Sequence, residues 1–306
     1  MSGVSHVYYR GSLAFCNYTC SYCPFSKRKG GASQLERDRE QLCRFARKIG
    51  AEGNGGFSGT VQFVPYGEAL IHEYYWQGMA ELSAFPHIEA VGAQSNFSFP
   101  VKEMLCRYRS FGGDVEKLRL WGTFHPEMTS VGDFLGQCGT LAEAGVSFCV
   151  GAVGAPEHLD ALWELRHGLD PSVYMWINKM DGMGRPYTEE ERKSFLEIDK
   201  YFELELRHIR PDRSACASSV LVLGNGDMRP CVLCHEKMGN LYADGLPNYI
   251  SREYIFPECA RTWCDCFLAY GSRNDIEELR AFGAHPAFRI VAGERNLIYH
   301  ASMDGF

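Results

Sequence analysis

Six short apolar stretches rich in β-branched and aromatic residues recur along the first 200 residues, separated by longer amphipathic stretches. They are residues 5–15, 61–66, 87–95, 115–124, 145–153 and 172–178. Several of the segments between them repeat apolar residues every three or four positions, which is the helical period. Strands that alternate with helices on this scale form a parallel sheet with helical crossovers. The pattern therefore predicts about six β/α units up to roughly residue 205.

Residues 131–144 have the clearest helical pattern. One face of this helix collects the apolar side chains Val131, Phe134, Leu135, Cys138 and Leu141. Ser130 is placed as its N-cap, and Gly145 ends it. Residues 33–49 and 157–168 have the same character. Six units fit an open or partial barrel better than a closed eight-stranded one, so we expect an α/β fold with a partial (β/α)6 TIM-type barrel.

The pattern changes after the polar segment at residues 207–216. The remaining residues have weak periodicity and many glycines, prolines and cysteines. Such a composition is typical of a small domain held together by metal rather than by a large core. We therefore predict a barrel domain at residues 1–210 and a small metal-dependent domain with a C-terminal tail at residues 211–306.

The overall composition excludes several classes of protein. With 45% hydrophobic and 23% charged residues, the chain has enough apolar content for a full core. The net charge of −7 argues against a general nucleic-acid binder, which needs a basic face. The chain has neither an uninterrupted run of 18 apolar residues nor a signal-peptide layout. We therefore expect a cytoplasmic protein with neither a nucleic-acid nor a membrane partner.

Thirteen cysteines are the main chemical clue, because disulfides are rare in the cytosol and clustered cysteines there more often bind metal. Three lie in "CNYTCSYCPF" at residues 16–25, and six lie in residues 216–266. The six are Cys216, Cys231, Cys234, Cys259, Cys264 and Cys266. Of the remaining four, Cys106, Cys138 and Cys149 have apolar neighbours and are interpreted as small core residues.

The first group, Cys16, Cys20 and Cys23, has the spacing C-x3-C-x2-C. A structural zinc site needs four ligands and usually draws them from C-x2-C pairs. Three thiolates on one loop suit a cubane iron–sulfur cluster with one iron left open for a substrate or cosubstrate. A zinc knuckle, or an incomplete metal site, is the structural alternative.

With Tyr22 directly before the last cysteine, this motif resembles the signature of the radical S-adenosylmethionine (SAM) enzymes. The resemblance implies a [4Fe-4S] cluster whose open iron binds the amino and carboxylate groups of SAM. It also implies reductive cleavage of SAM to a 5′-deoxyadenosyl radical, which abstracts a hydrogen atom from a substrate C–H bond. A flavodoxin- or ferredoxin-type protein is the implied reductant.

Further elements at the predicted strand ends resemble the SAM-binding elements of that family. Gly67 and Glu68 match the last two residues of its Gly-Gly-Glu element, while Tyr66 replaces the first glycine. Asn96 and Thr123 follow the third and fourth strands at positions similar to the family's polar contacts. Thr123 is alternatively a hydroxyl that satisfies a turn.

The fifth and sixth strands carry the expected contacts to adenine. Val153, Gly154 and Glu157 resemble the family's G-x-I-x-G-x-x-E element with one residue fewer between the glycines. Ile177 and Asn178, on the sixth strand, are expected to contact the edge of the adenine ring. The structural alternative for the first set is a plain strand-to-helix turn, in which Glu157 is favourable in the first helical turn.

His125 is a candidate acid/base or ribose contact, and alternatively a loop residue bonded to the backbone.

The second cysteine group opens with C-x9-G-x4-C, from Cys216 to Cys231, which resembles the auxiliary-cluster domains called SPASM and twitch. This resemblance implies one auxiliary [4Fe-4S] cluster in a small C-terminal iron–sulfur domain. The expected ligands are Cys216, Cys231 and two of Cys259, Cys264 and Cys266, with Cys234 as a spare; a structural zinc site is the alternative.

The expected net reaction is oxidation, by dehydrogenation, of a small polar substrate such as a sugar or an aminocyclitol. A peptide substrate is less expected, because residues 1–6 leave no room for a leader-binding domain. One alternative is epimerisation with a thiol hydrogen donor, and another is peptide modification or crosslinking. The candidate donors are Cys234, Cys149 and whichever of Cys259, Cys264 and Cys266 is not a cluster ligand. The alternative from another class is a non-enzymatic zinc or iron–sulfur scaffold.

Overall fold

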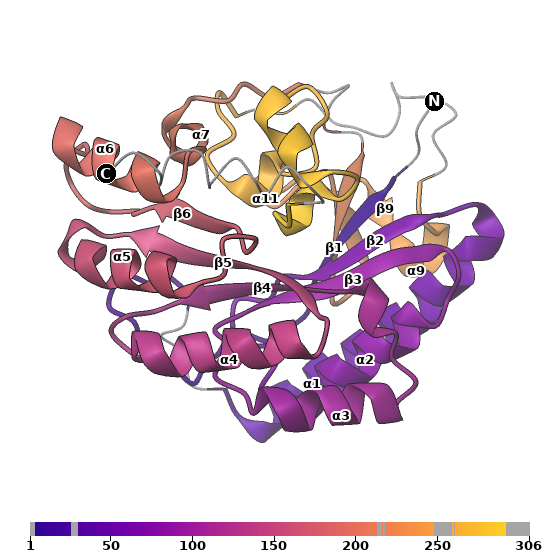
Figure 1. The fold of residues 1–306 in the computed structure, drawn as a ribbon. Coiled ribbons are helices and arrows are strands. Elements are labelled where there is room, and N and C mark those ends of the chain that lie inside the picture. The colour runs from indigo at the N-terminus through magenta and orange to yellow at the C-terminus, as the bar shows by residue number, and fades with distance from the viewer. Residues whose placement is uncertain are drawn as a thin grey trace.

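The computed structural model describes residues 4–25, 30–212, 216, 218–247, 259 and 261–291. At its centre lies a nine-stranded sheet in the order β6-β5-β4-β3-β2-β1-β7-β8-β9 (Figure 1). The strands are β1 (His6–Arg10), β2 (Gly59–Phe63), β3 (Ile88–Ser95), β4 (Leu118–Phe124), β5 (Ser147–Gly154), β6 (Met175–Lys179), β7 (Ser219–Leu223), β8 (Asp227–Arg229) and β9 (Gly239–Asn240). Each of the six stretches predicted as strands overlaps one of β1 to β6.

Strands β1 to β6 pair in parallel, each with its neighbour along the chain. Helices connect successive strands, as the alternating pattern predicted. The longer helices are α1 (Ala32–Glu52), α2 (Glu73–Ser83), α3 (Val101–Ser110), α4 (Val131–Glu143), α5 (Leu159–Gly168) and α6 (Glu189–Ile198). The predicted α/β fold with a parallel sheet is confirmed. The sheet is open, because β6 and β9 are its two edges in the part of the chain that the structure describes.

The predicted boundaries of α4 follow from its capping residues. The Ser130 hydroxyl accepts a hydrogen bond from the Asp133 N–H at the start of the helix. Gly145, which follows its end, has a φ of +74°, a conformation that glycine adopts without a steric penalty.

After α6 the chain forms shorter elements. They are α7 (Phe202–Leu206), α9 (Leu241–Asp244), α11 (Phe267–Tyr270) and the 3-10 turns η1 (Gly53–Gly55), η2 (Val115–Lys117), η3 (Pro156–His158), η4 (Glu277–Phe282) and η5 (Pro286–Phe288). β7 pairs in parallel with β1, so the cysteine-rich part of the chain extends the same sheet. β7 and β8 form a hairpin around a Gly-Asn-Gly-Asp turn, where Gly226 has a φ of +88°. The domain boundary at residue 210 stays a prediction.

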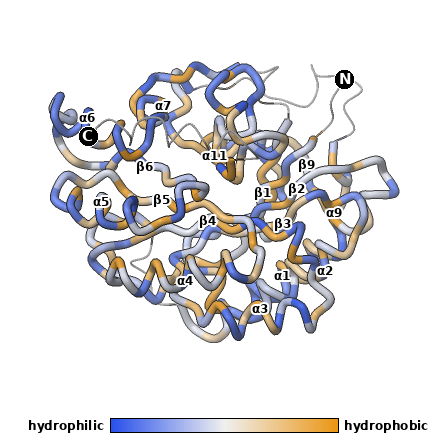
Figure 2. The backbone as a smooth tube through the Cα atoms, in the orientation of Figure 1, coloured by the Kyte–Doolittle hydropathy of each residue, from blue (hydrophilic) through white to orange (hydrophobic). Residues whose placement is uncertain are grey.

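The two faces of the sheet carry different cores. Helices α1 to α4 cover one face, whereas α7 and α11 lie over the other (Figure 1). The helix-covered face is built from alternate strand residues such as Val7, Leu120 and Ile177. The intervening residues, such as Tyr8, Trp121 and Trp176, pack with the C-terminal segment on the opposite face, called the inner face below. Figure 2 shows hydrophobic residues gathered along the central strands and hydrophilic ones toward the outer loops.

The scattered cysteines follow the sequence interpretation only in part. Cys138 and Cys149 are buried, as predicted, but Cys106 is exposed on α3. The prediction for Cys106 was wrong because its apolar neighbours in sequence, Met104 and Leu105, take the buried face of that helix. None of the helices in the described part of the chain has the length and apolar character that crossing a membrane requires.

Candidate functional site

A pocket of about 120 Å³ lies at the carboxyl ends of β2, β3 and β4, where parallel α/β folds place their ligands. Its lining combines the first cysteine group with residues from those strand ends. The lining residues are Cys16, Tyr18, Cys20, Cys23, Pro65, Tyr66, Gly67, Glu68, Gln94, Ser95, Asn96, Thr123 and His125. Eight residues singled out from the sequence thus share one pocket, although they span more than 100 positions of the chain.

The cysteine loop presents three thiols to this pocket. The Cys16 sulfur accepts a hydrogen bond from the Tyr18 N–H at 3.4 Å, and the Cys23 N–H donates to the Cys20 carbonyl at 3.2 Å. Burial is the largest of the effects that raise the pKa of Cys16 to about 11 and that of Cys20 to about 12, and the neighbouring thiols contribute to both. Without a metal, the thiols of Cys16 and Cys20 are therefore uncharged at neutral pH.

Soft thiolate donors that share a pocket suit iron–sulfur chemistry. Among the residues that the structure describes, no three His, Cys, Asp or Glu side chains converge closely enough to hold a single metal ion. A multi-iron cluster places its thiolates farther apart than one ion does, because each thiolate binds a different iron. Cys16, Cys20 and Cys23 fit such a group by donor type and by their common pocket.

Gly67 is placed by a close approach of two backbones. A β-carbon at this position would lie 2.0 Å from the carbonyl oxygen of Phe15, the residue before Cys16. The Glu68 N–H donates to the same carbonyl at 3.1 Å. The loop after β2 therefore lies directly against the start of the cysteine loop, and only glycine fits at this contact.

Glu68 is a buried carboxylate that joins two strand ends. One of its oxygens accepts hydrogen bonds from the Leu70 N–H at 2.9 Å and the Ser95 hydroxyl at 2.8 Å; the other accepts from the Asn96 N–H at 2.6 Å. Burial raises its pKa to about 7 despite these bonds. A carboxylate offers about four acceptor positions, so one is left for a ligand in the pocket.

Asn96 connects the end of β3 to the cysteine loop. Its side-chain amide donates to the Asn17 side-chain oxygen at 3.0 Å and lies 3.7 Å from the Cys16 sulfur. Thr123 lines the same wall of the pocket from the end of β4. Both predicted positions therefore face the cysteine loop, while their contacts to SAM stay predictions.

His125 is coupled to the cysteine loop through Tyr22. The Tyr22 hydroxyl lies 3.0 Å from His125 Nδ1, and the two rings stack with centroids 5.9 Å apart. Burial lowers the pKa of His125 to about 4, so the imidazole is neutral at physiological pH. In this state His125 can accept or donate a hydrogen bond but does not carry the proton of a general acid.

Glu127 was not singled out from the sequence, although it holds the cysteine loop directly. Its carboxylate accepts hydrogen bonds from the Ser21 N–H at 2.6 Å and from the Ser21 hydroxyl at 2.5 Å. His158 Nε2 lies 3.7 Å from the same carboxylate. One residue, Pro126, separates Glu127 from His125, and this closeness is the only signal that the sequence offers for it.

The predicted adenine contacts lie outside the lining of this pocket. Gly154 packs beside Ile177, and its carbonyl accepts a hydrogen bond from the Tyr187 hydroxyl at 2.8 Å. Ile177 is fully buried beneath the helices, so its side chain is on the face opposite the inner one. Val153 and Asn178 are partly buried, and Glu157 is exposed. Their contacts to adenine stay predictions. For Ile177, only the backbone is in a position to make such a contact.

Five of the six C-terminal cysteines influence one another electrostatically. Burial, then the neighbouring charge of Cys216, raises the pKa of Cys264 to about 11. Burial is the largest cause of the raised pKa of Cys216, Cys231 and Cys234. A smaller contribution comes from Cys259 for Cys216 and Cys234, and from Cys234 for Cys231. Cys234, predicted to be a spare, therefore lies with this group. The choice of ligands stays a prediction.

Cys266 has different surroundings. Besides burial, which raises its pKa, the groups that act on it are Glu205, Arg10 and Arg289 on the inner face of the sheet. Cys149, the other thiol considered as a hydrogen donor, is fully buried and donates to the Phe288 carbonyl at 3.2 Å.

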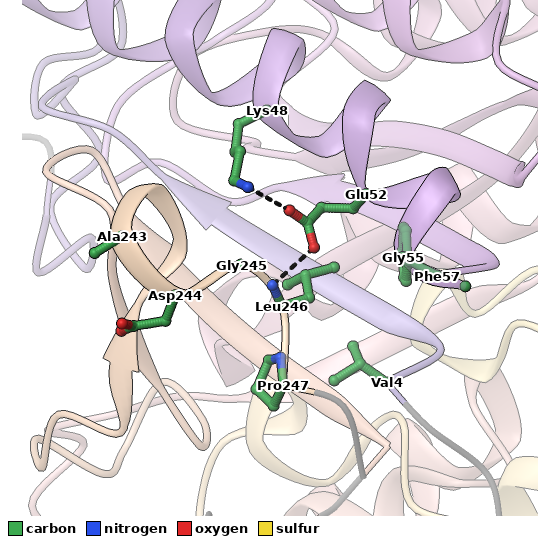
Figure 3. Close-up of a pocket in the computed structure, with 11 residues that line it drawn as sticks. Val4, Lys48, Glu52, Gly55, Phe57, Ala243, Asp244, Gly245, Leu246 and Pro247 are labelled. Carbon is green, nitrogen blue, oxygen red and sulfur yellow. Dashed lines mark hydrogen bonds and ion pairs between the residues drawn. The ribbon is translucent and has the colours of Figure 1, made fainter.

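A second cavity, of about 310 Å³, lies at the other end of the sheet, between α1 and residues 243–247 (Figure 3). Glu52 accepts from the Leu246 N–H at 2.8 Å and pairs with Lys48 at 2.6 Å. These polar groups satisfy one another, so they join α1 to the C-terminal part of the chain.

No family model and no curated protein matches the sequence. Among solved structures, native anSMEcpe with bound AdoMet (SAM) aligns with a TM-score of 0.53 at 13% identity, over 97% of each chain. Native anSMEcpe with AdoMet and the Cp18Cys peptide aligns with a TM-score of 0.50 at 13% identity, again over 97% of each chain. BtrN in complex with AdoMet and 2-DOIA has a TM-score of 0.41 at 16% identity, over 80% of this chain and 81% of that one. The likeness to anSMEcpe shows that the chain has the fold of a protein solved with bound AdoMet.

Proposed function

We propose that this chain is a radical SAM enzyme. The observation that carries the proposal is the single pocket in which three cysteines of one loop face Glu68, Asn96 and Thr123 from three successive strand ends. A structural metal clip has no need of a buried carboxylate beside its thiols. The fold, which is that of AdoMet-bound anSMEcpe, is consistent with this function.

In this proposal Cys16, Cys20 and Cys23 hold a [4Fe-4S] cluster. When bound, such a cluster supplies the single electron that splits SAM into methionine and the 5′-deoxyadenosyl radical. Glu68 has a free acceptor position for the ammonium group of SAM, and Asn96 and Thr123 contribute polar contacts to the rest of the ligand. Tyr22 and neutral His125 hold the cysteine loop against the end of β4.

The proposed reaction is the oxidation of a small polar substrate. The 5′-deoxyadenosyl radical takes a hydrogen atom from a substrate C–H bond and becomes 5′-deoxyadenosine. The substrate radical then loses one electron and one proton, which completes a dehydrogenation. We propose that Cys216, Cys231 and two further cysteines of the C-terminal group hold one auxiliary [4Fe-4S] cluster as the electron acceptor. A flavodoxin- or ferredoxin-type protein is the proposed source of the first electron.

Peptide modification is the second candidate function. It is favoured by the structure of anSMEcpe with the Cp18Cys peptide, whose fold this chain shares. A peptide substrate would make 5′-deoxyadenosine release depend on a peptide rather than on a metabolite. Adding each class of compound to the reconstituted enzyme therefore separates the two candidates.

The experiment that tests the proposal measures iron, acid-labile sulfide and SAM cleavage after anaerobic reconstitution. We expect about eight irons per chain and release of 5′-deoxyadenosine with dithionite. The variant in which Cys16, Cys20 and Cys23 are all replaced by alanine should retain about four irons and cleave no SAM. Cys106→Ala is the matched control, because Cys106 is an exposed thiol outside both groups.

Two results would contradict parts of the proposal. A colourless protein that contains zinc and cleaves no SAM would make the chain a metal-binding scaffold. About four irons together with zinc in the wild type would make the C-terminal cysteines a structural zinc site, and the reaction would then need no internal electron acceptor.

A further inference from the structure

Arg10 is a cation bonded to Tyr66, which lines the candidate SAM pocket. It ends β1, and its Nε donates to the Val64 carbonyl at 2.9 Å while one terminal nitrogen donates to the Tyr66 hydroxyl at 3.0 Å. The guanidinium lies 4.2 Å from the centroid of the Tyr66 ring. A guanidinium has five N–H donors, so these two bonds leave three of them for other groups.

Arg229 shares this face of the sheet. It pairs with Leu221 of β7, and Leu221 pairs with Tyr8 of β1. Paired residues on neighbouring strands project to the same side of a sheet, and Leu221 and Tyr8 belong to the inner core. Arg229 therefore lies on the inner face, as does Arg10, two residues beyond Tyr8. Burial lowers the pKa of Arg10, and the positive charge of Arg229 lowers it further.

Within the described ranges, neither arginine forms an ion pair. The side-chain partner of Arg229 is His235, at 3.2 Å. Among the carboxylates around them, Glu68 accepts three hydrogen bonds and Glu205 pairs with Arg289 at 2.7 Å. Glu236 acts on Cys234, as Arg229 does, and is exposed. Two partly buried cations are thus left without an ion-pair partner among the described residues.

The location of the two arginines connects them to the proposed reaction. Tyr66, which holds Arg10, lines the candidate SAM pocket. Arg229 lies two residues before Cys231, and its charge acts on Cys234, while Arg10 acts on Cys266. The pair therefore lies between the first cysteine group and the second, which is where a substrate has to reach both.

We propose that Arg10 and Arg229 form an anion-binding subsite that holds a carboxylate or phosphate group of the substrate. This inference rests on the proposed function and narrows it to substrates that carry a negative charge. Guanidinium groups match both anions geometrically, because each can donate two parallel hydrogen bonds. It also assigns a role to Tyr66, which replaces a glycine of the family element and fixes the orientation of Arg10.

The test is a calorimetric titration of inorganic phosphate, and separately of acetate, into the reconstituted, SAM-loaded protein at low salt. We expect saturable binding of at least one of the two anions, and the tighter one identifies the group that the subsite prefers. Arg10→Gln and Arg229→Gln should each weaken that binding about tenfold or more, the loss expected for one charge-assisted hydrogen bond. Arg109→Gln, at the opposite end of the barrel, should bind as the wild type does.

Charge-preserving variants separate a lost charge from a disturbed fold. Arg10→Lys and Arg229→Lys should bind phosphate more tightly than the glutamine variants, because the positive charge remains. Equal affinity in the wild type and in both glutamine variants would overturn the proposal. So would weakening by Arg109→Gln to the same extent, because binding would then reflect net charge alone.

The arginines could instead neutralise thiolates of the second cysteine group. In that case Arg229→Gln would shift the reduction potential of the iron–sulfur centres and leave phosphate affinity unchanged, which also overturns the proposal. Failure of the proposed function has a different readout, the absence of iron and of 5′-deoxyadenosine. Calorimetry and product analysis therefore distinguish the two failures.

Discussion

Gly67 lies so close to Phe15 that a β-carbon on residue 67 would be 2.0 Å from the Phe15 carbonyl oxygen. This contact brings the loop after β2 against the residue that precedes the first cysteine. The position of Glu68 relative to the thiols therefore depends on residue 67 being a glycine, which has no β-carbon.

Replacing Gly67 by alanine should move the two loops apart. We expect a loss of unfolding free energy on the order of 1–3 kcal/mol, as for other overpacked sites, together with weaker SAM binding. Denaturant unfolding and calorimetry measure the two effects. Gly136→Ala on α4 is the control: its β-carbon meets nothing within 4 Å, so helix propensity should make this variant slightly more stable. Wild-type stability and SAM affinity in Gly67→Ala would contradict the interpretation of this contact.

Glu68→Gln should disturb the end of β3 as well as ligand binding. A glutamine replaces one of the two oxygens by an N–H₂ group, which then faces either the donors of Leu70 and Ser95 or the donor of Asn96. Leaving a buried donor unpaired costs about 1–3 kcal/mol. Thermal unfolding and SAM titration should both change in this variant, but not in Glu143→Gln, whose carboxylate is exposed on α4.

Glu127→Gln should loosen the cysteine loop. It replaces one of the two oxygens that accept hydrogen bonds from Ser21, a loss of about 1 kcal/mol. We expect iron to leave the reconstituted protein roughly fivefold faster in the presence of a chelator. The rate can be followed by visible absorbance, again with Glu143→Gln as the control. An unchanged rate would mean that Glu127 does not stabilise the loop.

Glu205 and Arg289 form a buried ion pair on the inner face, with Arg289 also 3.3 Å from the centroid of Phe267. Glu205→Gln should lower the unfolding free energy by about 3–5 kcal/mol, because it leaves a buried guanidinium without its counter-charge. The double variant Glu205→Gln/Arg289→Met should lose much less than the sum of the single losses. Denaturant unfolding of all four proteins measures the coupling, and strict additivity would show that the pair is not coupled.

Asp199 should make stability depend on pH. It accepts hydrogen bonds from the Tyr174 hydroxyl and the Ile177 N–H, and burial raises its pKa to about 6. A folded-state pKa above the unfolded one means that the folded protein binds more protons between about pH 4 and pH 6. The unfolding free energy should therefore fall across this range as pH rises, by up to about 3 kcal/mol.

The Asp199→Asn variant isolates this effect, because asparagine does not titrate. The unfolding free energy of the variant minus that of the wild type should be higher at pH 7.5 than at pH 4, by up to about 3 kcal/mol. Urea unfolding at both pH values measures the difference. The same stability difference between the two proteins at both pH values would contradict the assignment to Asp199.

Local periodicity was enough to predict the six parallel strands and the helices that separate them. The alternation of apolar stretches reflects which side chains face a core, and that requirement is local. Ser130 and Gly145 bounded α4 for the same reason, since capping involves only residues next to the helix ends. Likewise, the spacing of Cys16, Cys20 and Cys23 alone pointed to a three-thiolate loop.

The contacts that assemble the site were decided by the tertiary structure. The sequence contains no sign that Glu127 reaches Ser21, 106 positions earlier, or that Arg10 and Arg229 share a face through two strand pairings. It also could not show that β7 joins β1, because sheet neighbours are chosen by non-local packing. Sequence by itself therefore determined which elements and donors this protein has. The three-dimensional packing decided which of them meet, because contacts between distant residues depend on the fold as a whole.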